Sequence, residues 1–260
     1  MRKLKNKNEG INMAKTIKVK KSEIAFTIAV MFLVGFIAGM QFVPREVQLN
    51  QPNLDGEVVV SMTLPAVDNE GSGVAGMLYT TVKPGTGKIL VDTSRVLNYI
   101  DTQLSARTAA KAASNYAKVD LNGLDIIYVI KVNASIIEGP SAGASMALSV
   151  LLALENKTSG NITITGTISP DGTIGKVGSI LEKGLAAKAN GARTFLVPKG
   201  QATAEKTTRN TTCSRLGSMD VCKVNYLAEN INIESYLGIE VHEVANLEEA
   251  YRYFNQSSLP

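Results

Sequence analysis

The sequence is poor in the residues that most often bind metals. It has one histidine, His242, and two cysteines, Cys213 and Cys222. Because neither cysteine has a histidine nearby in the sequence, the ligand spacing of a zinc site is missing, and we expect neither a metal nor another cofactor. A catalytic hydroxyl group in this chain would have to use His242 or a different kind of base.

A recognisable ATP-binding loop is also missing. The segments KPGTGK (83–88) and DGTIGKVGS (171–179) both contain Gly-Lys. Neither has a glycine five positions before that pair, and neither has Ser or Thr directly after the lysine, as a phosphate loop requires. We interpret both segments as hairpin turns, and we expect no ATPase module.

Acidic residues are scarce at the N-terminus. Residues 1–21 hold eight basic side chains and one acidic one, although the net charge of the whole chain is only +4. The remainder is therefore mildly acidic, and we expect no nucleic-acid partner. Since an apolar segment follows the basic tail, a lipid surface is the better candidate for its partner.

No charged residue occurs in residues 24–43, a run of 20 residues with only Thr27 and Gln41 polar. Such a helix would be roughly 30 Å long, which matches the apolar core of a bilayer. We therefore predict a basic tail (1–23), a transmembrane helix (24–43), a linker (44–56) and one domain (57–255). A cleaved signal peptide and a buried core helix are the alternatives, although no clear cleavage site follows.

The lysines before the apolar segment place the N-terminus in the cytoplasm and the domain outside it. An extracytoplasmic location fits the two cysteines, which lie in a polar stretch that resembles a loop. In an oxidising compartment, Cys213 and Cys222 would form a disulfide. Two free buried thiols are the alternative.

The rest of the chain mixes strand and helix patterns, which predicts one α+β domain. Expected strands are 57–68, two strands within 76–93 around the turn Pro-Gly-Thr-Gly, 124–132, 161–168, 194–198 and 239–244. Expected helices are 94–117, about 141–155, 179–190 and 246–254. We find no internal repeat.

The segment GPSAG (139–143) places a serine where a helix is predicted to begin. The following proline should hold Gly139 in an extended conformation, and Pro140 suits a first helical turn. Free N–H groups at this helix start could stabilise an oxyanion if Ser141 attacked a carbonyl, and Ala142 leaves room for the substrate backbone. The same residues would also cap an ordinary helix.

A serine nucleophile needs a base, and the candidates are His242 and a lysine with a lowered pKa. Ser179 and Glu182 have the spacing of a capping box, which places Lys183 in the first turn of a helix. A helix dipole disfavours a cation there, so a neutral lysine is plausible. Helical spacing alone does not choose between Lys183 and Lys188.

Two longer segments carry a resemblance to a known family. They are EGPSAGASMAL (138–148) and ITGTISPDGTIGKVGSILEKGLAAKANGARTFLVP (164–198). In order and spacing they closely resemble the proteolytic domain of the Lon proteases. The resemblance implies an α+β fold of mixed sheets with packed helices, preceded here by the predicted transmembrane helix.

The resemblance also implies roles for individual residues. Ser141 would be the nucleophile, Lys183 the general base, and Thr165 the hydroxyl group that orients the lysine. Glu138 matches an acidic position near the site, and backbone N–H groups around Ser141 would form the oxyanion hole. Thr167 and Ser179 depart from the family pattern. The resemblance implies a serine endopeptidase that assembles as a homo-oligomeric ring. Because no ATPase module is recognisable in the sequence, which departs from the family, we expect ATP-independent cleavage of unfolded proteins or peptides.

Two other functions remain open at this stage. Residues 139–143 also satisfy the G-x-S-x-G pattern of esterase-like hydrolases, in which Asp220 and His242 would complete the triad in the right chain order. Alternatively, a Lon-like domain without turnover could bind peptides or serve assembly.

Overall fold

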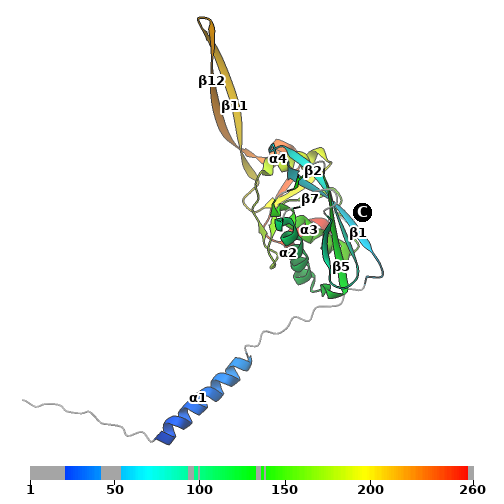
Figure 1. The fold of residues 1–260 in the computed structure, drawn as a ribbon, viewed down its shortest axis with the longest axis vertical. Coiled ribbons are helices and arrows are strands. Elements are labelled where there is room, and N and C mark those ends of the chain that lie inside the picture. Colours follow the sequence, from blue (N-terminus) through cyan, green and yellow to red (C-terminus); the bar gives the residue numbers. More distant parts are fainter. Residues whose placement is uncertain are drawn as a thin grey trace, which may run out of the picture. The chain divides into compact units, whose positions relative to one another are not determined.

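The computed structural model describes residues 21–41, 54–92, 97–98, 100–132, 136–137 and 139–256. The chain divides into two compact units, Met1–Val47 and Gln48–Pro260, and each is described by itself (Figure 1). Glu138 lies outside the described residues.

The first unit contains helix α1 (Lys21–Gln41). The large apolar side chains described in this helix are all exposed, from 43% for Val30 to 76% for Phe32. No helix among the described residues is both long enough and apolar enough to cross a membrane. The predicted transmembrane helix at 24–43 therefore has no support from this finding.

The second unit is built around a four-stranded sheet. Its order is β1 (Val58–Val67), β2 (Gly73–Pro84), β5 (Leu124–Lys131) and β3 (Ile89–Asp92). β2 is antiparallel to both β1 and β5, whereas β3 runs parallel to β5. The predicted hairpin at KPGTGK is therefore wrong, because β5 lies between the two strands that this segment joins.

A carboxylate explains why this connection wraps around the end of β5. Asp125 accepts hydrogen bonds from the backbone N–H groups of Thr86 (2.8 Å) and Lys88 (3.0 Å). These bonds lower the pKa of Asp125, since they favour its charged form. The loop is thus fixed to β5, and β3 continues along the far edge of that strand.

Several helices pack against the sheet or against one another beside it. α3 (Gly143–Leu154) packs against β1 and β2, and α2 (Ile100–Ala117) packs against α3. α3 is rich in Ala, Leu and Met, and its only polar side chains are Ser145 and Ser149, which suits a helix that is buried on nearly every side. α2 starts later than predicted, because β4 (Leu97–Asn98) precedes it and pairs with β6 (Ile136–Ile137).

A second sheet completes the fold, and its elements occupy the C-terminal half of the chain. Parallel strands form it in the order β13 (Glu240–Val244), β10 (Thr194–Pro198), β7 (Ile162–Ile164). The remaining elements are the hairpin β8 (Thr167–Ile168) with β9 (Ile174–Gly175), and helices α4 (Ile180–Ala189), α5 (Ile233–Leu237) and α6 (Leu247–Gln256). Two short 3₁₀ turns are Leu121–Gly123 and Pro140–Ala142. The predicted mixed α+β class is confirmed.

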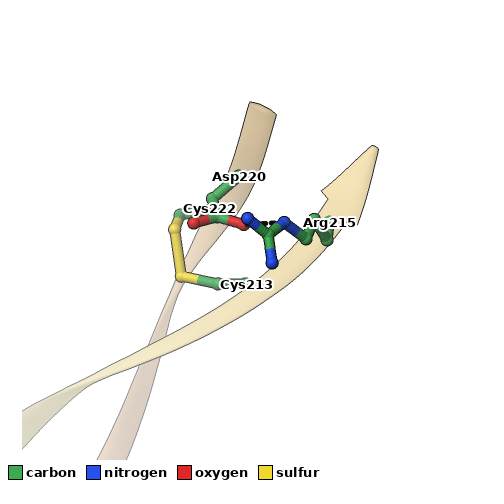
Figure 2. Close-up of a disulfide and its surroundings, with 4 residues drawn as sticks. All are labelled: Cys213, Arg215, Asp220 and Cys222. Carbon is green, nitrogen blue, oxygen red and sulfur yellow. Dashed lines mark ion pairs between the residues drawn. A yellow bond between two sulfur atoms is a disulfide. The ribbon is translucent and has the colours of Figure 1, made fainter. Parts of the chain in front are cut away.

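One long hairpin projects from this unit (Figure 1). Strands β11 (Thr203–Leu216) and β12 (Met219–Asn232) are antiparallel over their whole length. The sequence interpretation of the cysteine region as a loop is therefore wrong. Thr, Arg and Asn alternate with few apolar residues in β11, so the period that marks a half-buried strand is absent there. A disulfide joins Cys213 to Cys222 across the hairpin (Figure 2).

Candidate active site

Ser141 lies in the 3₁₀ turn Pro140–Ala142, directly before α3. Its carbonyl group accepts a hydrogen bond from the N–H of Gly166 (3.0 Å), and Ala144 donates its N–H to the carbonyl of Gly166 (3.0 Å). These two bonds fix the serine segment to the link between β7 and β8. The hydroxyl-bearing residue is half-buried at the start of a helix, as the sequence predicted.

Gly139, directly before the turn that carries Ser141, has a backbone conformation that few other residues can adopt. Its backbone angles are φ 89° and ψ 156°, a combination that is nearly restricted to glycine. The predicted extended conformation is thus right for ψ and wrong for φ. An ideal Cβ at Gly139 would meet no atom within 4 Å, so the backbone angle alone requires glycine here.

Lys183 lies in the first turn of α4 and is only 4% exposed. Burial lowers the pKa of its amine to about 8, because desolvation disfavours the ammonium form. The predicted helix is confirmed, but its capping box is not formed. Ser179 is left-handed (φ 55°) and its side chain caps no backbone N–H, whereas a capping serine has extended angles.

Ser141 and Lys183 line the same small cavity, whose volume is about 40 Å³. The other lining residues are Gly139, Ala142 and a continuous piece of β1, Leu64, Pro65, Ala66 and Val67. The sequence pattern predicts this strand but does not place it at the site. One signal was available: a proline inside a strand indicates an edge strand, and β1 is an edge of its sheet.

The competing lysine lies elsewhere. Lys188 is exposed in the last turn of α4, and its ammonium donates to the carbonyl of Leu237 in α5. It therefore caps the end of α5. Of the two lysines that the helical spacing left open, the structure places only Lys183 in the cavity with Ser141.

Thr165 is fully buried between the serine and the second sheet. Its hydroxyl group donates to the carbonyl of Ser141 over 3.5 Å, and its N–H donates to the carbonyl of Leu196 (3.1 Å). The contact described for Thr165 is thus with the serine backbone, whereas the resemblance implied a contact with the lysine. In this position Thr165 supports the serine turn.

A second supporting residue was not visible in the sequence. The side-chain amide of Gln201 donates to the carbonyl of Val177 (2.7 Å), and its oxygen accepts the N–H of the same residue (3.0 Å). Val177 lies just before the turn that starts α4. Gln201 therefore fixes the chain at the point where the helix carrying Lys183 begins.

Asp220 and His242, the triad partners of the esterase-like alternative, do not lie beside Ser141. Asp220 is exposed near the tip of the β11–β12 hairpin, where it pairs with Arg215 (3.8 Å) (Figure 2). His242, in β13, stacks on Tyr253 (4.8 Å between ring centroids) and lies 3.8 Å from Glu240. Neither residue lines the cavity that contains Ser141.

A serine hydroxyl group and a desolvated amine in one apolar cavity are the parts of a serine hydrolase that uses lysine as its base. The amine accepts a proton only in its neutral form, and burial supplies that form near pH 8. The geometry therefore defines a class of acyl-transfer enzymes that needs no histidine.

Comparison with known proteins identifies the family of the chain. Residues 72–248 match the model of the Lon protease (S16) C-terminal proteolytic domain, so the chain belongs to this family. It is 28% identical over 182 residues to the Lon protease of Phenylobacterium zucineum, covering 66% of this chain and 23% of that protein. It is 31% identical over 138 residues to the Lon protease of Roseiflexus castenholzii, covering 51% of this chain and 16% of that protein.

A shorter segment is more similar still. It is 46% identical over 63 residues to the Lon protease of Clostridioides difficile, covering 24% of this chain and 8% of the relative. The chain spans less than a quarter of the length of these relatives. The predicted enzyme class, a Lon-type serine endopeptidase, is confirmed at the level of the family.

Proposed function

We propose that this chain is a membrane-tethered, ATP-independent serine endopeptidase that cleaves unfolded proteins or peptides. Ser141 is its nucleophile and Lys183 its general base. The observation that carries the proposal is the cavity that these two residues share. A domain kept only for binding would have no use for a buried lysine beside a serine, since burying an amine is costly.

The catalytic cycle follows from these two groups. Neutral Lys183 takes the proton of the Ser141 hydroxyl group as its oxygen attacks the carbonyl carbon of the substrate. Backbone N–H groups around Ser141 stabilise the oxyanion. The ammonium of Lys183 then protonates the leaving amine, and an acyl group remains on Ser141. Water, deprotonated by the same lysine, releases the acyl group and restores the enzyme.

The cavity wall favours an extended substrate. β2 occupies one edge of β1, and on the other edge the carbonyls of Ser61 and Thr63 accept side-chain hydrogen bonds from the segment around β7. Alternate residues of a strand direct their backbone groups to the same edge. Pro65 and Val67 continue the series of alternate residues that begins with Ser61 and Thr63, so their backbone carbonyls are also directed to that edge, beside Ser141. An unfolded segment could pair there as an additional strand, which a folded protein could not do.

The membrane tether is proposed from the sequence of 24–43, its uncharged length and the lysines that precede it. The Cys213–Cys222 disulfide fits a domain outside the cytoplasm. Extraction of cell membranes with alkaline carbonate tests the tether. A full-length chain that appears in the extract, instead of remaining with the lipid, would refute it.

The activity is tested with the purified full chain and two substrates, unfolded casein and a stably folded protein. We expect cleavage of casein alone, at the same rate with and without ATP and Mg²⁺, and inhibition by a serine-reactive fluorophosphonate. Cleavage that requires ATP would contradict ATP independence. Complete inactivity with no fluorophosphonate labelling would favour the peptide-binding alternative.

The pH dependence should report the base. Because the pKa of Lys183 is lowered to about 8, the reactive neutral amine is lost as the pH falls below that value. We expect kcat/KM to fall about tenfold per pH unit below pH 8 and to level off above it. The measurement is kcat/KM for a fluorogenic peptide from about pH 6 to about pH 10. A rate that stayed constant as the pH fell below 8 would contradict a lysine base.

A further inference from the structure

The β11–β12 hairpin contacts α5 only at its base, where Lys206 lies over the ring of Tyr236 (4.6 Å to the ring centroid), and the rest of the hairpin has no third strand beside it within the described residues. β11 and β12 form a separate two-stranded sheet, and every residue from 207 to 230 is exposed. Two-stranded hairpins are marginally stable in water and normally gain stability from a third strand or a packed face. The disulfide near the tip constrains the hairpin but covers none of its backbone edges.

The two edges of the hairpin differ in character. β11 carries four charged residues, Glu205, Lys206, Arg209 and Arg215, and β12 carries three, Asp220, Lys223 and Glu229. Charged side chains are one way in which proteins protect a free edge from pairing. β12 is richer in apolar residues, and most of these are strongly exposed: Met219 66%, Val221 50%, Val224 37%, Tyr226 69% and Leu227 61%. The free edge of β12 is therefore the more suitable one for another strand.

The disulfide shows which backbone groups of β12 are directed outward. The Cα atoms of Cys213 and Cys222 are 4.0 Å apart, the short spacing of a non-hydrogen-bonded pair. The N–H and C=O groups of Cys222 thus point away from β11. The same holds for every second residue along β12, which includes Val224, Tyr226 and Ala228.

A second copy of β12 can pair with these outward backbone groups if it runs antiparallel to the first and is related to it by a two-fold axis at Tyr226. Tyr226 then faces Tyr226 of the second copy as a hydrogen-bonded pair, and residues 220 to 232 are paired along nearly the whole strand. Lys223 faces Glu229 of the second copy in a non-hydrogen-bonded pair, where side chains approach most closely. The two-fold symmetry repeats this ion pair.

The neighbouring registers lose that complementarity. An axis at Asn225 places Lys223 opposite Leu227, and an axis at Leu227 places it opposite Ile231. Within its own hairpin Glu229 lies opposite Lys206, so the paired strands would alternate in charge as Lys206, Glu229 and Lys223 of the second copy. No like charges face one another in the Tyr226 register.

We infer that β12 pairs with β12 of a second copy of this chain, about a two-fold axis at Tyr226, to form a four-stranded antiparallel sheet. The partner is another molecule of the same protein, and the contact is isologous. It is separate from the cavity that holds Ser141 and Lys183. The inference therefore does not depend on the proposed peptidase activity.

Charge reversal tests the register directly. The full chain, purified in detergent with its disulfide intact, is examined by analytical ultracentrifugation for its dimer dissociation constant. Lys223→Glu replaces two ion pairs by two like-charge pairs. Glu229→Lys does the same when it is combined with Lys206→Glu, which keeps opposite charges at the Lys206–Glu229 position within each hairpin, and each of these two variants should weaken the dimer about tenfold or more. When the two variants are mixed, heterodimers have opposite charges at both positions, and the original affinity should return.

Arg209→Glu is the matched control, because it makes the same charge change on the exposed β11 strand and should leave the dimer intact. A wild-type protein that is monomeric at all concentrations would overturn the inference. So would a dimer unaffected by Lys223→Glu, which would place the contact on β11 or on the first unit. Peptidase activity, measured in the same samples, decides the proposed function separately.

Discussion

Replacing Ser141 by alanine, or Lys183 by methionine, should each reduce peptide-bond hydrolysis by about 10³-fold or more. Members of a nucleophile–base pair act as a unit, so losing either one costs nearly as much as losing both. Methionine keeps most of the volume and the apolar stem of the buried lysine but has no amine. The measurement is kcat/KM for an unfolded substrate, together with fluorophosphonate labelling of the serine.

His242→Ala is the control for the base. His242 is partly exposed in β13 and contacts Glu240 and Tyr253, outside the cavity, so its removal should leave the rate nearly unchanged. A large loss in this variant, with activity retained in Lys183→Met, would assign the base to the histidine. Lys188→Ala should likewise remain active, since Lys188 binds the carbonyl of Leu237.

The methionine variant should also be more stable than the parent at neutral pH. The pKa of Lys183 is about 8 in the folded state and 10.5 when unperturbed. The amine of the unfolded chain therefore binds its proton more tightly than the buried amine of the folded protein does. Below pH 8 the folded state therefore carries a cost of about 3 kcal/mol for the buried ammonium. A gain in thermal stability with loss of activity would separate loss of the base from misfolding.

The two residues of the proposed catalytic pair both lie in local motifs, although only the resemblance to the Lon proteases favoured Lys183 over Lys188. The Gly-Pro-Ser turn before an apolar helix places Ser141, and the helix pattern after Gly178 places Lys183 near a helix start. The wall of the cavity could not be predicted in this way. Leu64–Val67 joins the site only through the pairing of strands far apart in the sequence, and hydrophobic pattern does not specify strand order.

The errors of the sequence interpretation have related causes. The turn at KPGTGK has the composition of a hairpin, but the hydrogen bonds of Asp125 lead the chain past β5. The capping box at Ser179 has the right residues, but Ser179 is left-handed, and the side-chain cap is lost. The long hairpin lacks a buried face, so the alternation that identifies most strands is absent. In each case a contact or an exposure outside the motif decided the outcome.

Gly73→Ala should reduce activity by about 10²-fold although Gly73 bears no functional group. Gly73 starts β2 opposite Val67, and an ideal Cβ there would lie 2.1 Å from the carbonyl oxygen of Glu182. Atoms cannot approach so closely, and the obstacle is backbone in the first turn of α4. The turn that carries Lys183 must therefore move by about 1 Å, a misplacement that is enough to cost two orders of magnitude.

Gly178→Ala provides the matched control. Gly178 lies in the segment that enters α4, and an ideal Cβ there would meet no atom within 4 Å. The Gly73 variant should lower kcat and reduce stability by about 1–3 kcal/mol, as overpacking does, while the Gly178 variant changes neither. Both are measured by kcat, KM and thermal unfolding. If Gly73→Ala folded normally and cleaved at the parental rate, the close packing of β2 on α4 could not be what holds Lys183 beside Ser141.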